Sequence, residues 1–202
     1  LNAGPGFGGS CFQKDILNLV YLCRHFGLPE VADYWESVVA LNTWQQHRIA
    51  RLVVQKLFGT VTGKRLAILG FAFKADTNDT REAPAIRICQ DLLEEGAQLV
   101  IHDPKVATDQ MARDLQQESA SQVDALSGSG SWARANSVED AVMGADAVLV
   151  LTEWQHYRDL NWQALAARMR KPAWVFDARA VADPAQIKAA GLSLWRVGDG
   201  EG

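Results

Sequence analysis

The chain of 202 residues is predicted to form an α/β fold with a parallel sheet that follows a helical segment. Short apolar runs typical of buried parallel strands recur at residues 65–70, 98–103, 147–151, 173–177 and 192–197. Helical patterns separate these runs at residues 84–95, 138–143, 160–169 and 184–190. Strands that alternate with helices favour a Rossmann-like parallel sheet with helices on both faces.

The first helix is expected to begin directly after Cys11. Apolar residues recur there at the spacing of one helical face, at Ile16, Leu19, Val20 and Cys23. The segment Gly27-Leu28-Pro29 ends this helix and allows a second one to begin.

The second helix is predicted to be unusually long, because residues 30–58 contain neither glycine nor proline. At about 1.5 Å per residue it would span roughly 45 Å, which exceeds an ordinary globular helix. Such a helix bridges two domains or packs against a partner chain. The alternative is two ordinary helices that break near Asn42 and Thr43, where the apolar pattern thins.

Residues 59–64 are polar and bounded by glycines, and they predict a boundary. The helical segment would then comprise residues 1–60, and the Rossmann-like domain residues 61–202. Residues 116–137 are rich in Ser, Gly, Gln and Ala and are predicted to form a surface loop.

The overall composition excludes several classes of function. A net charge of −4 argues against non-specific binding of nucleic acid. No apolar run approaches the roughly 18 residues that a membrane span requires, so no membrane segment is expected. The three cysteines and four histidines show no spacing typical of metal ligands, and the cysteine usage favours a reducing, cytoplasmic location. The chain does not begin with methionine, and we expect it to be part of a longer protein.

The opening residues combine a glycine-rich loop with a cysteine. Glycines let the backbone approach a ligand closely, and they stand here at Gly4, Gly6, Gly8 and Gly9. Lys14 and Asp15 follow Cys11 at offsets that place them beside the thiol on one helical face. A nucleophile, a cation and a base in this arrangement indicate covalent catalysis. The alternative is a small buried cysteine beside an ordinary glycine turn.

The segment Gly-Phe-Gly-Gly-Ser-Cys-Phe-Gln-Lys-Asp, residues 6–15, resembles the catalytic-cysteine segment of the UDP-glucose dehydrogenases. Nearly the whole chain resembles part of such an enzyme of the UDP-glucose/GDP-mannose dehydrogenase family. The resemblance implies oxidation of UDP-glucose to UDP-glucuronate with two molecules of NAD+. Cys11 would be the nucleophile, Asp15 would orient or activate water, and Lys14 would hold NAD+ or oppose oxyanion charge. The long helix would link two Rossmann-like domains and form the contact of a homodimer or larger homo-oligomer.

The same resemblance implies the residues that bind the substrate and the cofactor. The loop around the sugar would contain Gly4, Gly6, Phe7, Gly8 and Gly9. Phe73 and Lys74 follow the first strand of the sheet, where open α/β sheets bind phosphates, and they would contact UDP-glucose. Arg81 would reach NAD+, together with Cys11 and Lys14. Arg179 follows the strand at residues 173–177 and would bind the substrate, although Ala178 stands where the family commonly has glycine.

Other features are given structural roles. The segment at residues 70–82 lacks G-x-G-x-x-G, so no dinucleotide fingerprint is present there. Asp103 precedes Pro104 and is interpreted as a turn residue, and Trp154 as packing under a loop. The histidines are expected on the surface or satisfied in the core.

Two other functions stay open from the sequence. One is a sibling enzyme that oxidises GDP-mannose or an N-acetylated UDP-sugar. The other is a non-catalytic module for nucleotide binding and dimerisation. The resemblance places the NAD fingerprint outside these 202 residues, so the chain by itself is expected to bind UDP without turning over substrate.

Overall fold

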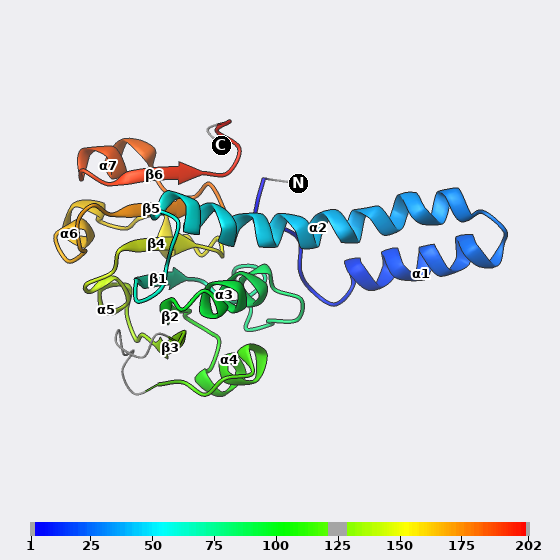
Figure 1. Cartoon of the computed structure of the whole chain (residues 1–202), viewed down its shortest axis with the longest axis horizontal. Helices are drawn as coiled ribbons and strands as arrows, with labels where there is room; N and C mark the ends of the chain where they lie inside the picture. Colours follow the sequence, from blue (N-terminus) through cyan, green and yellow to red (C-terminus); the bar gives the residue numbers. More distant parts are fainter. Residues whose placement is uncertain (1–2, 121–128, 201–202) are drawn as a thin grey trace.

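A computed structural model describes residues 3–120 and 129–200 of the chain. Its centre is a six-stranded sheet in the order β3-β2-β1-β4-β5-β6, in which every pair of neighbours is parallel (Figure 1). The strands are β1 (Arg65–Leu69), β2 (Gln98–His102), β3 (Ser131–Arg134), β4 (Ala147–Val150), β5 (Trp174–Asp177) and β6 (Ser193–Arg196). This is the strand order of a doubly wound Rossmann fold, in which the chain adds strands outward on one side from β1 and then on the other side from β4. The predicted fold class is therefore confirmed.

Strand β3 lies inside the segment that the sequence predicted to be a loop, and that part of the prediction is wrong. The strand is short and lies at the edge of the sheet, where it pairs only with β2. Its fixed point is Trp132, which is fully buried and donates its indole N–H to Gln117 O at 2.9 Å. Residues 121–128 of the predicted loop lie outside the described residues.

Three of the five described α-helices of the sheet domain begin at a side-chain cap, whereas α3 (Pro84–Glu94) and α4 (Thr108–Leu115) begin after an alanine. The capped helices are α5 (Val138–Val142), α6 (Trp162–Ala166) and α7 (Pro184–Ala189). Side-chain oxygens of Ser137, Asn161 and Asp183 accept backbone N–H groups at the starts of α5, α6 and α7. Helix α4 was not anticipated, and it buries only Met111 and Leu115.

Helix α2 (Pro29–Lys56) runs unbroken for 28 residues, so the two-helix alternative is wrong. The apolar pattern thins at Asn42 for a different reason. Asn42 is buried, with 7% of its surface exposed, and it uses its amide to hold another segment of the chain. Thr43 meanwhile bonds back to Val39 O within the helix.

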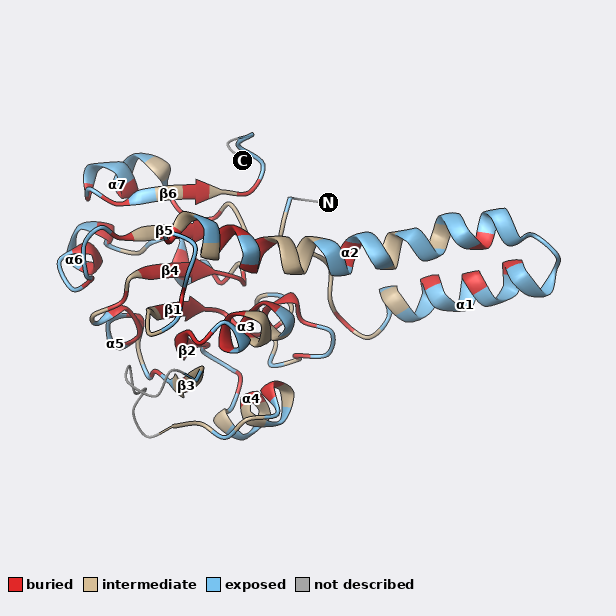
Figure 2. Cartoon of the chain, in the orientation of Figure 1, coloured by how far each residue is buried: buried red, intermediate tan, exposed pale blue. Residues whose placement is uncertain are grey.

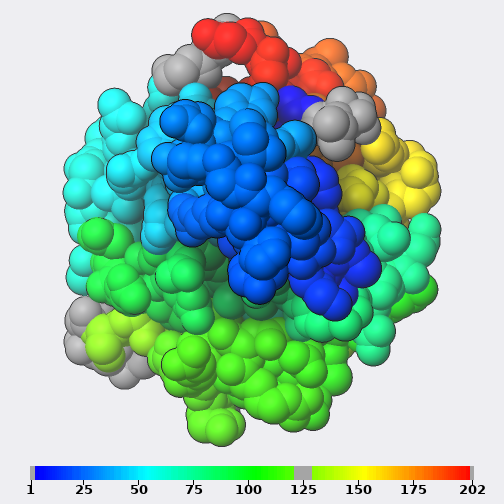
Figure 3. Space-filling model, turned by 90° about the vertical axis from the view of Figure 1, so that its right-hand side faces the viewer, coloured from blue at the N-terminus to red at the C-terminus, as the bar shows by residue number. Residues whose placement is uncertain are grey.

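Two separate cores share helix α2. Its first half packs against α1 (Phe12–His25) in a hairpin whose small core comprises Ile16, Val20, Cys23 and Ala32. Its last turns enter the large core of the sheet domain through Ile49, Val53 and Leu57. The hairpin projects away from the sheet domain and is largely exposed, whereas the buried residues concentrate around the sheet (Figures 1 and 2). Viewed from its tip, the hairpin stands in front of the domain (Figure 3). The predicted division near residue 60 stays a prediction, since α2 contributes to both cores.

Within the described residues, no helix has the length and apolarity needed to cross a membrane.

The end of β1 gives a test of the packing at the switch point between β1 and β4. Gly70 has a φ of 94°, and a Cβ there would lie 2.7 Å from Thr152 N. We predict that Gly70→Ala lowers the free energy of unfolding by about 3 kcal/mol or more, through strain and overpacking. The matched control is Gly144→Ala, because Gly144 also has a positive φ, of 65°, but no atom within 4 Å of the added Cβ.

The control should cost only about 1 kcal/mol, the price of the left-handed backbone alone. Denaturant unfolding of both variants measures the difference. Equal losses would show that Thr152 does not limit the space at the end of β1.

Candidate active site

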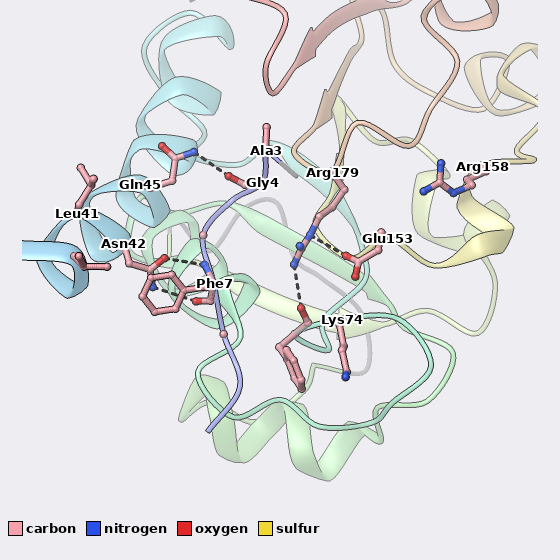
Figure 4. Close-up of a pocket in the computed structure, with 14 residues that line it drawn as sticks. Ala3, Gly4, Phe7, Leu41, Asn42, Gln45, Lys74, Glu153, Arg158 and Arg179 are labelled. Atoms are coloured by element: carbon pink, nitrogen blue, oxygen red, sulfur yellow. Dashed lines mark hydrogen bonds and ion pairs between the residues drawn. The ribbon is translucent and has the colours of Figure 1, made fainter. Parts of the chain in front are cut away.

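A pocket of about 630 Å³ lies between helix α2 and the carboxyl ends of β1, β4 and β5 (Figure 4). Residues 3–8 pass along it as a loop, with α2 on one side and Arg179 and Lys74 on the other (Figure 4). It is lined by Ala3, Gly4, Gly6, Phe7, Gly8, Val38, Leu41, Asn42, Gln45, Phe73, Lys74, Glu153, Arg158 and Arg179. The carboxyl edge of a doubly wound sheet, at the reversal of strand order, is the usual place for a ligand.

Helix α2 holds the glycine loop by its backbone. Asn42 Oδ1 accepts the N–H of Phe7 at 2.8 Å, and Asn42 Nδ2 donates to the carbonyl of Phe7 at 3.1 Å. Gln45 Nε2 donates to Gly4 O at 3.0 Å. A Cβ on Gly6, whose φ is 127°, would lie 2.7 Å from Asn42 Oδ1, so this approach requires glycine. No sequence motif marked Asn42 or Gln45, although a polar interruption in an apolar helix face was a usable signal.

The loop after β1 contacts the glycine loop on the side opposite to helix α2. Gly9 N donates to Arg81 O at 2.8 Å. A Cβ on Gly9 would lie 3.1 Å from the ring of Phe73, and one on Gly8 would collide with Glu82 O. The structure therefore brings Gly8 and Gly9 together with Phe73 and Arg81, which lie far from them in the sequence.

Arg179 is the most enclosed cation of the pocket, with 16% of its side chain exposed. Its Nε donates to Leu151 O at 2.8 Å, its Nη2 donates to Phe73 O at 3.1 Å, and Glu153 Oε2 lies 3.2 Å from Nε. Burial lowers the pKa of the guanidinium from its ordinary value, and the Glu153 carboxylate partly opposes that shift. The Arg179 side chain is thus fixed in one orientation, with Nη1 directed toward Gly4, 3.6 Å from the place of a Cβ there.

The pocket has a surplus of positive charge. Among the described residues that line it, Lys74, Arg158 and Arg179 are cations and Glu153 is the single carboxylate, which leaves two positive charges in excess. The ammonium of Lys74 lies 5.3 Å from the centre of the Phe73 ring. Arg158 was missed in the sequence, although a basic residue soon after the end of β4 is a recognisable signal. The pocket is therefore suited to an anion attached to a flat or apolar group.

Cys11 is exposed and stands at the N-terminal end of α1, one residue before the helix begins. A second cleft of about 400 Å³ lies beside it, lined by Ser10, Gln13, Lys14, Leu17, Arg81 and Glu82. Residues 8–10 run from the first pocket to this cleft, since Gly8 lines the former and Ser10 the latter. Cys11 itself lines neither cleft and directly follows Ser10 of the second one.

Arg81 reaches the second cleft while it is paired with Asp79. Its Nη2 lies 2.6 Å from Asp79 Oδ2, and its Nε lies 3.0 Å from Asp79 Oδ1. The hydrogen bond to Asp79 raises the pKa of the fully exposed Arg81 guanidinium, and the same bond lowers the pKa of the Asp79 carboxyl. The charge of Arg81 is therefore partly balanced before any ligand arrives.

The structure places nine of the twelve predicted site residues along the two clefts, whereas Gly9, Cys11 and Asp15 line neither. Seven line the first pocket, namely Gly4, Gly6, Phe7, Gly8, Phe73, Lys74 and Arg179. Lys14 and Arg81 line the second. Asp15 is exposed on α1 and lines neither, and its backbone N–H bonds to Cys11 O at 2.8 Å as the helical turn requires. Their roles stay predictions at this point.

Comparison with known proteins gives two family matches. The description "UDP-glucose/GDP-mannose dehydrogenase family, UDP binding domain" matches residues 67–184, and the central domain of the same family matches residues 1–44. The chain is 45% identical over 98% of its length to UDP-glucose 6-dehydrogenase 5 of Oryza sativa subsp. japonica and to UDP-glucose 6-dehydrogenase 1 of Arabidopsis thaliana. It spans 43% of the length of each of these relatives.

Solved structures share the fold. A UDP-glucose dehydrogenase from Pyrobaculum islandicum superposes with a TM-score of 0.71 at 25% identity, over 96% of this chain and 38% of that one. An NDP-N-acetyl-D-galactosaminuronic acid dehydrogenase from Methanosarcina mazei Go1 superposes with a TM-score of 0.72 at 22% identity, over 98% of this chain and 39% of that one. The second similarity concerns the fold alone.

The double hydrogen bond of Asn42 can be tested by a change of one atom. In Asn42→Asp the group that donates to Phe7 O becomes an acceptor, so two oxygens face each other in a buried place. We predict a loss of about 2 kcal/mol in the free energy of unfolding, with altered amide resonances for Gly6 and Phe7.

The matched control is Asn18→Asp on the exposed side of α1, which should change stability by less than about 0.5 kcal/mol. Denaturant unfolding and ¹H–¹⁵N spectra of both variants give the comparison. Unchanged Phe7 and Gly6 resonances in Asn42→Asp would contradict the role of Asn42 as the clamp of the glycine loop.

Proposed function

This chain belongs to the UDP-glucose/GDP-mannose dehydrogenase family, and we propose that it supplies the catalytic cysteine and the UDP-sugar-binding domain for NAD-dependent oxidation of UDP-glucose to UDP-glucuronate. The named plant relatives are UDP-glucose 6-dehydrogenases. The chain spans less than half of their length, so the oxidation as a whole is proposed only for a protein that contains this chain.

The surplus of two positive charges in the first pocket is the observation that supports this function best. Both phosphate groups of a UDP-sugar carry negative charge. A guanidinium group can donate two parallel hydrogen bonds to two oxygens of a phosphate. Arg179 is rigidly held with Nη1 toward the glycine loop, and Lys74 adds a mobile ammonium. We assign the diphosphate to these two residues and the uridine to the neighbourhood of Phe73.

The sugar would then lie along the glycine loop, from Gly4 to Gly9, which lines the first pocket with Gly4, Gly6 and Gly8. Phe7 packs edge-on against Phe12 at 4.7 Å between ring centres, which ties the loop to the start of α1. Because Cys11 lies just beyond this loop, C6 of the glucose unit is expected to point toward the thiol.

The proposed chemistry has two oxidations that share one covalent residue. The first converts the C6 alcohol to an aldehyde, and the Cys11 thiolate attacks its carbon to form a thiohemiacetal. The second oxidation converts this adduct to a thioester. Water then adds to the thioester carbonyl, releases the thiolate of Cys11 and leaves the carboxylate of UDP-glucuronate. Asp15 is proposed to orient or deprotonate this water, and Lys14 to oppose charge on the oxyanion.

NAD+ would take up a hydride in each oxidation. The second cleft fits part of it, because Lys14 and Arg81 bring two cations to the edge of the cleft beside Cys11. Arg81 would exchange part of its bond with Asp79 for a cofactor phosphate, while Lys14 approaches from α1. The three described cysteines are all free, which supports the proposed cytoplasmic location.

The covalent role of Cys11 is tested in the natural full-length protein. We predict that Cys11→Ala lowers the rate of UDP-glucuronate formation by about three orders of magnitude or more, because no thioester can form. UDP affinity should stay within about twofold of the wild type, since the uridine and diphosphate contacts remain. Product analysis by chromatography and calorimetric titration with UDP provide the two measurements.

The control is Cys23→Ala, which removes the buried cysteine of the hairpin core and should retain UDP-glucuronate formation. Wild-type rates in Cys11→Ala would exclude covalent catalysis by this residue. A panel of UDP-glucose, GDP-mannose and UDP-N-acetylhexosamines decides the substrate, and preference for one of the latter would assign the protein to a sibling activity.

We also propose that the exposed hairpin is a contact between two copies of the chain. Many large apolar side chains of the hairpin are more than one-third exposed, namely Phe12, Leu17, Leu19, Tyr21, Leu22, Phe26, Leu28, Val31, Tyr34, Leu41 and Trp44. Monomeric proteins rarely leave such a continuous apolar surface uncovered. A homodimer through α2 would cover it symmetrically.

If the hairpin forms this contact, one charge introduced on the hairpin should lower the mass of the assembly in solution. Tyr34→Glu should shift the protein from a dimer or larger assembly toward a monomer in sedimentation analysis, because Tyr34 is 66% exposed on the hairpin. Met143→Glu is the control, since Met143 is an apolar residue of the sheet domain with 50% exposure. A monomeric wild type, or a Tyr34→Glu variant with unchanged mass, would contradict the proposed contact.

A further inference from the structure

Asp103 lies directly after β2 and is buried, with 1% of its surface exposed. Its Oδ2 atom accepts the backbone N–H of Phe71 at 2.7 Å and that of Ala72 at 3.0 Å. The indole N–H of Trp154 donates to the same oxygen at 3.2 Å. The carboxylate therefore joins the end of β2 to the turns after β1 and β4.

The other oxygen of Asp103 organises its own turn. Oδ1 accepts the N–H groups of Lys105 at 2.9 Å and of Val106 at 3.0 Å. The prediction of a turn at Asp103 is thus correct for this oxygen but leaves out the other one. Within the described residues, all five hydrogen-bond partners of the carboxyl group are donors, three to Oδ2 and two to Oδ1.

The turn held by Asp103 leads directly into the first pocket. Thr152 Oγ1 donates to Ala72 O at 2.6 Å, which fixes the carbonyl of a residue whose N–H is bound to Asp103. The next two residues are Phe73 and Lys74, which line the pocket. The position of both side chains therefore depends on the turn at Phe71 and Ala72.

We propose that Asp103 is a positioning residue for UDP-sugar binding, acting as an internal anion that occupies the turn after β1. In nucleotide-binding sheets of this order, the backbone N–H groups of that turn receive a phosphate. Here the carboxylate of Asp103 takes them, so a ligand diphosphate is displaced toward Lys74 and Arg179. This inference rests on the proposed function, because it concerns the same pocket.

The experiment measures the affinity of the protein for UDP by calorimetry. Asp103→Asn keeps the shape of the side chain but turns an NH₂ group toward N–H donors on one side, so UDP should bind roughly tenfold more weakly. Asp140→Asn is the matched control, since Asp140 is exposed on α5, and its affinity should equal that of the wild type. Lys74→Ala reports direct loss of a pocket cation.

A rescue experiment separates positioning from a general loss of structure. In Asp103→Ala, excess formate should recover much of the UDP affinity and return the Trp154 indole N–H resonance toward its wild-type position, whereas chloride at equal ionic strength should not. Formate without effect on a folded Asp103→Ala, or Asp103→Asn with wild-type affinity, would overturn the proposal.

If both Asp103 variants fail to fold, Trp154→Phe decides, because it removes one donor to Oδ2 and retains an aromatic ring. Weaker UDP binding by about two- to fivefold supports the proposal, and unchanged affinity overturns it. Failure of the proposed function looks different, since the wild-type protein would then not bind UDP and Lys74→Ala would be no weaker.

Discussion

The position of the candidate active site depends on the double hydrogen bond between the Asn42 side chain and the backbone of Phe7. Asn42 lies between the two halves of α2, one of which belongs to the hairpin core and the other to the core of the sheet domain. A single rigid helix therefore relates the hairpin, the glycine loop and the sheet. Any tilt of α2 relative to the sheet would move the loop, and with it Cys11, relative to Arg179. One element thus positions both Cys11 and the first pocket.

The opposite wall of the site is held by buried charges at the carboxyl edge of the sheet. Asp177 is fully buried and accepts the N–H groups of Arg179 and Ala182 at 3.1 and 2.8 Å. Burial raises the pKa of its carboxyl, and these N–H groups partly oppose that rise. Asp103 likewise accepts backbone N–H groups of the turn after β1, those of Phe71 and Ala72. Loops whose backbone N–H groups are bound internally keep their shape without a ligand, so the pocket is largely preorganised.

The sequence predicted the structural elements that depend on local residue patterns. Apolar runs gave five strands, and the absence of helix breakers gave the length of α2. Contacts between distant segments were not visible. The link from Asp103 to Phe71 spans 32 residues, and that from Asn42 to Phe7 spans 35. Strand β3 was missed because Trp132 alone anchors it beside a segment rich in Ser and Gly. Most of the site residues named by resemblance line the clefts, although Gly9, Cys11 and Asp15 do not. The residues that hold them in place had no motif.

The pocket at the sheet edge and the exposed Cys11 differ in their surroundings, and the proposed chemistry uses this difference. In the proposed function, the nucleotide would bind at a rigid sheet edge with fixed charges, and the reaction would take place at the exposed Cys11 at the start of α1. In the proposed reaction the substrate stays attached at its diphosphate while C6 passes from alcohol to aldehyde to thioester. A strong anchor remote from the reacting carbon makes each later step effectively unimolecular, because the intermediate does not have to be captured again. The enclosed Arg179 and the accessible Cys11 are therefore complementary requirements of one pathway: the guanidinium needs burial to bind tightly, and the thiol needs exposure to meet both a cofactor and water.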